Sequence, residues 1–376
     1  MTQYDKSDRT GWVADRPIDG SGRPPIDASK VLAGRDGYVA AMRAVVLSED
    51  RPTLELVDLP DPEPGPGEAL IRVTACGICG SDLHVACKVA AAGTVLGHEI
   101  AGTIEALGPG VYPVAWRTGE TVAVRPFFGC GTCPSCTRGR ADHCDAFALM
   151  GMARPGGFAE LTTVQVRELY RLPAAVTGVE QALVEPLAVA RRAVRRGGVT
   201  RQDSVAIIGG GPIGQAILAW VRFLGVTDIT VSDPAPGRRA LAAAMGASRT
   251  LDPITDELDL LDVTLRGADV VFECVGRTGM ISQAMDIAGI DGRVVVVGVC
   301  ITDDSFTPYT GLRKELDVRF ALYYGPEDFL ETIDVLESGG LALDGFVGET
   351  VDLDGLPSRF AELVAGADGG KVVLTI

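Results

Sequence analysis

Four cysteines lie close together in the chain and could hold a metal ion. They are Cys130, Cys133, Cys136 and Cys144, and they span fifteen residues. Four thiolates on one compact loop can close a tetrahedral shell around a borderline-soft ion such as zinc. A closed shell leaves no position for a substrate, so this metal would be structural and would stabilise a lobe too short to bury a core of its own. Free thiols and an iron–sulfur cluster are the alternative interpretations.

A thiolate and an imidazole upstream of this loop could hold a second metal ion. Cys79 lies in the segment Gly-Ile-Cys-Gly-Ser-Asp-Leu-His that covers residues 77–84, and His98 directly precedes Glu99. Both side chains are ordinary zinc ligands, and a site with only two or three protein ligands keeps a position for a substrate oxygen, which is typical of catalytic zinc. Two alternatives remain, namely a redox pair of Cys76 with Cys79 and a packed core histidine.

A glycine-rich turn further along the chain could bind a dinucleotide. It follows the β-branched run 205–208 and contains Gly209, Gly211, Pro212, Ile213 and Gly214. Without Cβ atoms the turn can approach a pyrophosphate, which would lie at the positive N-terminus of the following helix. Asp233 ends the next expected strand about twenty residues later, where a carboxylate can accept hydrogen bonds from both ribose hydroxyls and repel a 2′-phosphate. We therefore expect NAD rather than NADP; a glycine-rich turn in some other α/β domain is the alternative.

The elements that must position these residues change character near residue 188. Before it, short strands dominate, as at 44–47, 53–57 and 69–73. After it, short runs rich in β-branched residues alternate with segments of helical spacing. The expected strands are 205–208, 229–232, 270–273, 293–297, 346–351 and 372–376, and the expected helices are 213–224, 238–245, 281–288, 329–336 and 356–363. Alternation of this kind implies parallel strands with crossover helices.

Composition excludes several classes of function. The 376 residues include 34 Lys and Arg against 50 Asp and Glu, and the net charge of −16 has the wrong sign for binding nucleic acid or a membrane surface. No apolar run approaches the roughly 18 residues that a membrane-spanning helix needs. Nine cysteines, an odd number, and the lack of a secretory signal favour the cytoplasm. Residues 1–41 show no sustained period, so we expect a mobile extension; an arm packed on the body or on a second subunit is the alternative.

Taken together, these motifs resemble the zinc-dependent medium-chain dehydrogenase/reductase family, which includes the alcohol and polyol dehydrogenases. The resemblance covers residues 42–376 and rests on five motifs in the family's order. They are the segment 77–84, Gly97-His98-Glu99, the four-cysteine loop, Val184-Glu185-Pro186-Leu187 and the glycine-rich turn. The resemblance implies an α/β fold with two domains. A GroES-like, β-rich catalytic domain (42–188 and 325–376) would be interrupted by a Rossmann NAD-binding domain with a doubly wound parallel sheet (189–324).

The same resemblance implies roles for residues around a catalytic zinc, which would be one of two zinc ions in the chain. Cys79 and His98 would be ligands, and Glu99 would be an acid beside the metal that can also move onto it. Glu185 would occupy the place where many alcohol dehydrogenases have a third cysteine, and whether it binds zinc directly or through water stays open. Ser81 and His84 would join the cofactor ribose in a relay that carries a proton to solvent; a capping or packing role for His84 is the alternative.

Further residues of the NAD site follow from the resemblance alone. Arg238 would lie near the adenine ribose, and Lys371 would be a late contact to the pyrophosphate. Val275 and Val299, which follow expected strands, would also contact the cofactor. Surface cations without a ligand are the alternative for Arg238 and Lys371.

The chemistry expected from this combination is hydride transfer between an alcohol and NAD. Zinc lowers the pKa of a bound alcohol, and the nicotinamide accepts the hydride. A Glu at 185 resembles the polyol and secondary-alcohol branch, whereas the short apolar loop expected at 85–92 would offer a sugar few hydrogen-bond partners. We therefore expect a secondary alcohol or ketone on a bulky or specialised molecule. A polyol or sugar dehydrogenase is the alternative, and a non-catalytic zinc- and nucleotide-binding protein is the alternative of another class.

Two further expectations concern the surface of the molecule. The resemblance implies a homodimer or homotetramer that pairs through the edge of the nucleotide domain, at roughly 307–320, with a small alcohol or ketone as the other partner. Arg191-Arg192, shortly after Glu185, makes this stretch more charged than the family's helix, and the sequence offers no account of the two arginines.

Overall fold

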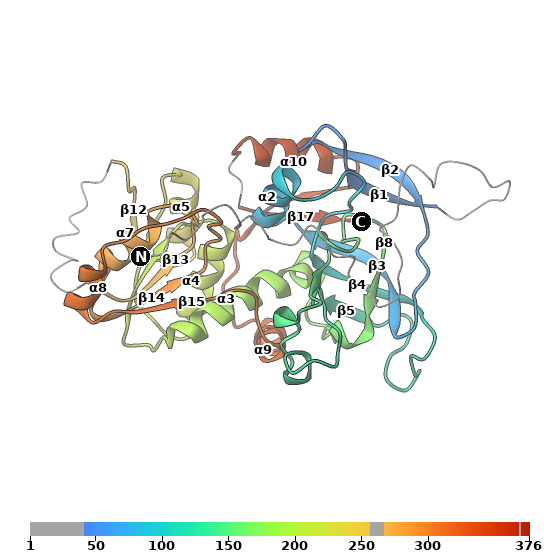
Figure 1. Ribbon diagram of the computed structural model, residues 1–376, viewed down its shortest axis with the longest axis horizontal. Coiled ribbons are helices and arrows are strands. Elements are labelled where there is room, and N and C mark those ends of the chain that lie inside the picture. Colours follow the sequence, from blue (N-terminus) through green and yellow to red (C-terminus); the bar gives the residue numbers. More distant parts are fainter. Residues whose placement is uncertain (1–40, 256–266, 368–369) are drawn as a thin grey trace, which may run out of the picture.

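Two lobes, each built on one large β-sheet, make up the described chain (Figure 1). The computed structural model describes residues 41–255, 267–367 and 370–376. The expected extension at 1–41 therefore lies outside the described residues, except for Ala41, which begins the first strand. Within the described ranges, no helix combines the length and the apolar character needed to cross a membrane.

The first lobe is built on a mostly antiparallel seven-stranded sheet. Its strands run in the order β16-β17-β3-β4-β5-β9, and β8 pairs with β3. They are β3 (Glu68–Gly77), β4 (Glu99–Leu107), β5 (Thr121–Val124), β8 (Leu161–Gln165), β9 (Leu169–Arg171), β16 (Val347–Val351) and β17 (Lys371–Thr375). Two small two-stranded antiparallel sheets complete the lobe, β1 (Ala41–Leu47) with β2 (Leu54–Pro60) and β6 (Phe127–Phe128) with β7 (Ala148–Leu149). Because β17 pairs with β3 so that Val373 faces Gly77, the end of the chain lies beside the segment that contains Cys79.

The second lobe is built on a parallel six-stranded sheet. Its strands run in the order β12-β11-β10-β13-β14-β15. They are β10 (Ser204–Ile208), β11 (Asp228–Ser232), β12 (Arg249–Leu251), β13 (Ala268–Glu273), β14 (Ala288–Val296) and β15 (Asp317–Phe320). The chain adds strands outward from β10 to β12 and then returns to place β13 on the other side of β10. Ligands of open parallel sheets bind at the carboxyl ends of the strands at such a reversal, and the glycine-rich turn lies there because it directly follows β10.

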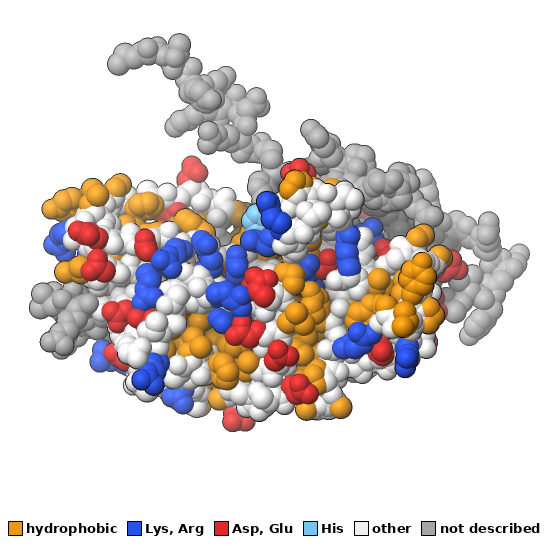
Figure 2. All heavy atoms as spheres, turned by 90° about the horizontal axis from the view of Figure 1, so that it is seen from below, with side chains coloured by type: hydrophobic (Ala, Val, Ile, Leu, Met, Phe, Trp, Pro, Cys, Tyr) orange, Lys and Arg blue, Asp and Glu red, His pale blue; other side chains and the backbone are white. Residues whose placement is uncertain are grey.

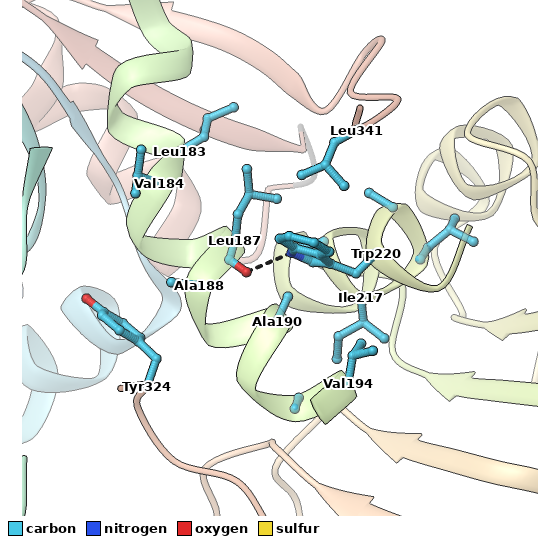
Figure 3. Packing of buried hydrophobic residues seen from close by; sticks show 14 of the residues in the cluster. Leu183, Val184, Leu187, Ala188, Ala190, Val194, Ile217, Trp220, Tyr324 and Leu341 are labelled. Atoms are coloured by element: carbon cyan, nitrogen blue, oxygen red, sulfur yellow. Dashed lines mark hydrogen bonds between the residues drawn. The ribbon is translucent and has the colours of Figure 1, made fainter. Parts of the chain in front are cut away.

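Helices cover both faces of this parallel sheet. They are α3 (Val184–Gly197), α4 (Pro212–Phe223), α5 (Pro236–Ala244), α7 (Met280–Ile287) and α8 (Pro308–Lys314). Successive strand residues point to opposite faces: Ile207 joins the core beneath α3 and α4, whereas Ile208 joins the core beneath α7. The fully buried Trp220 of α4 fixes α3 in this core, because its Nε1 donates a hydrogen bond of 2.9 Å to the carbonyl of Leu187 (Figure 3).

The helices α3 and α9 (Pro326–Glu337) stand at the two places where the chain passes between the lobes (Figure 1). α3 packs against β4 and β5 of the first lobe as well as against β14 and β15 of the second. α9 packs along α3, and its Phe329 contacts Tyr170 of β9 with ring centroids 4.7 Å apart. The first lobe also contains α2 (Gly80–Lys88), α10 (Leu356–Val364) and the short 3₁₀ helices Cys136–Arg138, Ala141–His143, Val166–Glu168 and Gly178–Leu183.

One expectation about local structure is wrong. The segment 85–92 was expected to be a short apolar loop, but α2 continues to Lys88 and only the rest is irregular. The apolar side chains of Val85 and Ala86 are buried against the lobe, so they fill its core instead of facing a ligand. The segment therefore gives no reason to disfavour a sugar substrate.

Candidate active site

Three of the expected zinc-site residues come together at the ends of two neighbouring strands. Gly77 of β3 pairs with Glu99 of β4, so the residue two positions after the first strand and the residue just before the second become neighbours. The ligand atoms of Cys79, His98 and Glu99 all lie within 4.8 Å of one another. A thiolate, an imidazole and a carboxylate at this spacing suit zinc, so the residues present fit the expected metal.

Asp82 organises this ligand set, although no role was expected for it. Its carboxylate is 1% exposed and accepts hydrogen bonds from the backbone N–H of Cys79 (2.8 Å) and of Gly97 (3.3 Å). It also lies 3.2 Å from Nδ1 of His98, which fixes the imidazole and leaves Nε2 for a metal. Burial alone would lower the pKa of His98, but the neighbouring Asp82 and Cys79 outweigh burial and raise this pKa well above its ordinary value. The same negative charges that attract a proton would attract a metal cation.

Glu99 and Lys371 form a buried ion pair next to the ligand set. Both side chains are 1% exposed, and the ammonium contacts both carboxylate oxygens of Glu99 and donates a 2.9 Å hydrogen bond to the carbonyl of Ile78. Burial would lower the pKa of Lys371, but Glu99 and Cys79 raise it. The structure thus places Lys371 beside Glu99, and its contact with the pyrophosphate stays a prediction.

Glu185 reaches the same region from the first turn of α3. Among the described residues, Glu185 does not belong to the group formed by Cys79, His98 and Glu99, whose ligand atoms all lie within 4.8 Å of one another. Burial raises its pKa to about 7, with a further rise from Glu99 and an opposing effect of His98. The buried hydroxyl of Tyr324 is close enough to the Glu185 carboxylate to oppose this rise in pKa. Coordination of zinc by Glu185, directly or through water, stays a prediction.

An aromatic wall formed by Phe127, Phe147 and Tyr323 borders the site and was not expected from the sequence. Tyr323 packs on both phenylalanines, with ring centroids 5.1 and 5.4 Å apart. Its backbone φ of 54° lies in the left-handed region that a bulky side chain rarely adopts. The Tyr323 phenol is near enough to His98 and Glu185 for their charges to affect its pKa, although burial is the main cause that raises it. No sequence signal marks this wall, because its members come from three separate segments.

The two residues expected in the proton relay take different positions. Ser81 Oγ lies 3.4 Å from His98 Nε2, at the metal side of the imidazole. His84 is exposed one turn further along α2, and its Nδ1 lies 2.8 Å from the carbonyl of Gly80. The structure thus brings Ser81 into the site and His84 to the surface next to it, and the relay itself stays a prediction.

The four-cysteine loop is arranged as a thiolate site. All four sulfur atoms lie within 4.8 Å of one another, and those of Cys130 and Cys136 are 4.0 Å apart. Tetrahedral zinc with Zn–S bonds of about 2.3 Å places its sulfur atoms about 3.8 Å apart, so the spacing fits this metal. Hydrogen bonds from Thr132 and from the Cys133 backbone lower the pKa of Cys130 to about 5, which favours the ligating thiolate form.

The glycine-rich turn has the backbone geometry that a dinucleotide site needs. Gly209 has a φ of 97°, and Gly211 caps α4 directly before Pro212. A Cβ atom at Gly214 would collide with the carbonyl oxygen of Gly209, so this close helix–strand approach requires glycine. Ile213 follows Pro212 in the first turn of α4 and is half-buried.

Asp233 stands beside this turn in a buried position. Its carboxylate accepts hydrogen bonds from the backbone N–H of Gly210 (2.9 Å) and of Ala235 (2.8 Å). Arg238 Nη1 lies 3.5 Å from the same carboxylate, so this cation adjoins the turn, and its place near the adenine ribose stays a prediction. The carboxylate is therefore oriented by the backbone that would hold the pyrophosphate.

The strand ends next to the turn expose two of the expected cofactor contacts. Val275 follows β13 with 39% of its surface exposed, and Val299 follows β14 with 62% exposed. Glu273, the last residue of β13, was missed: it is buried and its carboxylate accepts the N–H groups of Val275 (2.6 Å) and Gly276 (2.8 Å). Glu273 therefore shapes the loop that presents Val275.

Comparison with known proteins agrees with these features. Residues 65–174 match the alcohol dehydrogenase GroES-like domain, and residues 212–338 match the zinc-binding dehydrogenase domain. The chain is 35% identical to 2-dehydro-3-deoxy-L-galactonate 5-dehydrogenase of Pseudoalteromonas atlantica over 83% of this chain and 92% of that protein.

Solved structures resemble the whole described architecture. An alcohol dehydrogenase of Escherichia coli CFT073 in complex with NADH has a TM-score of 0.83 and 26% identity, and the match covers 90% of this chain and 100% of that one. A Sinorhizobium meliloti 1021 protein with NADP bound has a TM-score of 0.81 and 29% identity, again over 90% and 100% of the two chains.

The two matched domains cover most of the chain, and the relative's identity extends across both lobes. The expected α/β fold is confirmed, with a GroES-like lobe and a Rossmann-like parallel sheet. The convergent Cys79, His98 and Glu99, the four-cysteine loop and the glycine-rich turn are thus features of a chain that belongs to the zinc-dependent medium-chain dehydrogenase/reductase family.

Proposed function

We propose that the protein transfers a hydride between NAD and the carbinol carbon of a secondary alcohol, in either direction, at the site formed by Cys79, His98 and Glu99. The observation that carries the proposal is the convergence of these three ligand types around the buried Asp82. Zinc held there would act as a Lewis acid on the alcohol oxygen, and NAD would accept the hydride.

The chain's own residues would prepare the site for this chemistry. Asp82 holds the His98 ring with its Nδ1 occupied, so Nε2 is directed toward the metal position. Ser81 adjoins that position and could take the proton that the alcohol releases while passing its own hydroxyl proton on, through the cofactor ribose, to His84 and solvent. Phe147 and Tyr323, which are half-buried, would exclude water from one side of the bound alcohol, with the fully buried Phe127 packed against both. Glu185, buried nearby, would supply a carboxylate directly or through water.

The substrate class is proposed from the relatives and from the aromatic wall together. The relative from Pseudoalteromonas atlantica is named as a dehydrogenase of a sugar acid. This favours a hydroxylated chain as one candidate, whereas the aromatic wall favours a bulky, partly apolar secondary alcohol as the other. Both candidates present a secondary carbinol to the same ligand set.

NAD is proposed as the cofactor because a buried carboxylate stands beside the glycine-rich turn. Asp233 can accept hydrogen bonds from ribose hydroxyls, and its charge disfavours a 2′-phosphate. Since one structural neighbour holds NADH and another holds NADP, the two cofactors need to be compared directly in this protein.

A substrate panel tests the proposal. Purified zinc-loaded protein would be assayed with NAD and with NADP on primary, secondary, cyclic and polyhydric alcohols and on sugar acids. We expect turnover of secondary carbinols with NAD and a clear ranking between the two substrate candidates. Equal rates on polyols and on cyclic or aryl secondary alcohols would reject a pocket selective for either one. Silence across the panel with zinc and NAD bound would favour a specialised substrate or a non-catalytic role.

We also propose that the protein forms a homodimer or homotetramer through the outer strand β15 and the adjoining α8. Among the described residues β15 is paired on one side only, and Leu312 of α8 and Phe320 of β15 expose 74% and 63% of their surfaces. Light scattering after gel filtration would give the assembly's mass, and Phe320→Glu would dissociate it. A monomeric wild-type protein would reject this proposal.

We also propose that the protein works in the reducing cytoplasm. None of its nine cysteines is in a disulfide bond, which supports this location.

A further inference from the structure

A cluster of opposite charges joins the two helices at the lobe boundary and accounts for the arginines that the sequence left unexplained. The α3–α9 charge cluster consists of Arg191, Arg192 and Arg195 on α3 and Glu327, Asp328 and Glu331 on α9. Basic (blue) and acidic (red) side chains adjoin over the middle of the face in Figure 2, on the side where α9 lies in Figure 1. Three arginines on one helix therefore face three carboxylates on the other.

The contacts within the cluster range from 2.6 to 3.9 Å, and most residues share partners. Glu331 binds two arginines at once, Arg191 at 2.8 Å and Arg195 at 2.6 Å. Arg195 also lies 3.1 Å from Asp328, whose side chain is fully buried. Arg192 completes the cluster at 3.9 Å from Asp328. A network of this kind is worth more than isolated surface pairs, because every partner except Arg191 is held by more than one contact.

α9 is itself anchored to the first lobe, so the acidic side chains of the cluster are held in place relative to that lobe. Asp328 accepts a 2.9 Å hydrogen bond from the backbone N–H of Gly325, which caps the helix. Phe329 packs on Tyr170 of β9, and Pro326 lies against Gly139 of the four-cysteine loop. The carboxylates thus stand on a scaffold formed by the catalytic sheet and the cysteine loop.

α3, the other side of the cluster, presents Glu185. Arg191 and Arg195 follow Glu185 by six and ten residues, which is about 9 and 15 Å along a helix axis. Tyr324 lies just before α9, and its buried hydroxyl is close to the Glu185 carboxylate. The chain from Tyr324 to Glu331 therefore follows α3 from its first turn to its last and contacts it at both ends.

We propose that the α3–α9 charge cluster is a positioning element for Glu185, with Arg195 and Glu331 as its central residues. The cluster fixes the position of α3 along its axis and its rotation about that axis relative to the catalytic sheet. It thereby fixes the Glu185 carboxylate relative to Cys79 and His98. This inference rests on the role proposed above for Glu185 and adds what holds that carboxylate in place. Because a misplacement of about 1 Å can reduce turnover on the order of 100-fold, a weakened cluster should lower kcat measurably.

The test uses the full-length protein and matched variants. Arg195→Gln, Glu331→Gln and the double variant weaken the cluster, and Arg195→Lys keeps its charge. Arg196→Gln and Asp334→Asn are controls, because both residues are exposed, lie on the same two helices and have no ion pair among the described contacts. For each variant, kcat and KM would be measured with the best alcohol of the panel, together with NAD affinity and thermal stability. Cobalt would replace zinc at the catalytic site, where its visible spectrum reports the ligand geometry.

We expect kcat to fall about tenfold in Arg195→Gln and in Glu331→Gln, with NAD affinity unchanged and a shifted cobalt spectrum. The double variant should lose little more than either single variant, because the two residues act together. Arg195→Lys should recover part of the loss, and both controls should match the wild type. High salt, about 1 M KCl, where the Debye length is about 3 Å, should lower the wild-type kcat toward that of Arg195→Gln.

Wild-type kcat and cobalt spectra in the cluster variants would overturn the inference, even if their thermal stability fell. Glu185→Gln separates this failure from a failure of the proposed function. If Glu185→Gln alters the cobalt spectrum while the cluster variants do not, only the positioning role of the cluster is rejected. If Glu185→Gln leaves the spectrum and kcat unchanged, the role proposed for Glu185 is rejected together with the positioning role.

Discussion

Substitution of Asp82 by Asn is expected to weaken the catalytic metal site while leaving the fold intact. The Asp82 carboxylate uses one oxygen for the N–H of Cys79 and the other for the N–H of Gly97 and the Nδ1 of His98. An Asn side chain has the same shape but only one acceptor oxygen. Its NH₂ group must therefore face at least one N–H donor, and that donor loses its partner in a site that is 1% exposed.

The size of the effect follows from this loss. A buried donor left without a partner costs about 1–3 kcal/mol, which corresponds to a loss of roughly 5- to 150-fold in an equilibrium constant. If His98 is the residue that loses its partner, the imidazole is no longer fixed for the metal. Partners of metal-ligating histidines elsewhere contribute about 10- to 100-fold to metal affinity. We therefore expect Asp82→Asn to weaken zinc binding at this site by about 10- to 100-fold.

Competition with a chromogenic chelator measures this affinity, and the four-cysteine loop serves as an internal control because Asp82 lies outside it. The variant should retain zinc in that loop and lose it from the Cys79 site at a lower chelator concentration than the wild type. Asp61→Asn, on an exposed residue, should behave as the wild type. Unchanged affinity at the Cys79 site in Asp82→Asn would refute the reasoning.

Four further predictions address the other parts of the site. Lys371→Gln leaves the buried Glu99 without its cation and should destabilise the protein by about 3–5 kcal/mol in urea unfolding. Recovery of stability in the double variant with Glu99→Gln would confirm that the unpaired carboxylate is the cause, and an unchanged unfolding midpoint in Lys371→Gln would contradict the prediction. Asp233→Asn should weaken NAD binding on the order of tenfold, or about 1.4 kcal/mol, and narrow the preference over NADP in kcat/KM, whereas an unaltered preference would count against the assignment. Burial raises the pKa of Glu185 from 4.5 to about 7, so this group's contribution to the stability of the metal-free protein is full below pH 4.5 and is lost as the pH rises through about 7. Glu185→Gln should therefore raise the melting temperature above pH 7 but not below pH 4.5. A melting temperature that shifts equally at every pH would be inconsistent with a raised Glu185 pKa. Cys133→Ser should release the metal of its loop and lower the thermal stability, while metal analysis still finds the zinc at the Cys79 site.

Local sequence patterns predicted most elements of the second lobe. Strands of a parallel sheet are buried on both faces, so runs such as 205–208 and 270–273 are recognisable by their β-branched residues alone. The glycine-rich turn was recognisable for a similar reason, since the close approach at Gly214 excludes every side chain. Both signals are contained in a few consecutive residues.

Contacts between distant segments could not be predicted in the same way. The pairing of Lys371 with Glu99 depends on β17 lying beside β3, which no local pattern specifies. Asp82 was present in the recognised segment, yet its role became visible only when α2 turned its carboxylate toward His98. The arginines of α3 are explained only by their ion pairs with α9, whose residues lie more than 130 positions further along the chain. Such pairings are set by the tertiary fold, and sequence periodicity carries no information about them.

The central claim is that the Cys79 site and NAD together move a hydride from a carbinol carbon. The most direct measurement is the transfer of deuterium from a secondary alcohol, labelled at its carbinol carbon, into NADH. We expect the wild type to place one deuterium at C4 of the nicotinamide in each turnover. Cys79→Ser should transfer none, although it retains NAD binding and the metal of the four-cysteine loop. Absence of label in NADH for every alcohol of the panel, or equal transfer by Cys79→Ser, would contradict the claim.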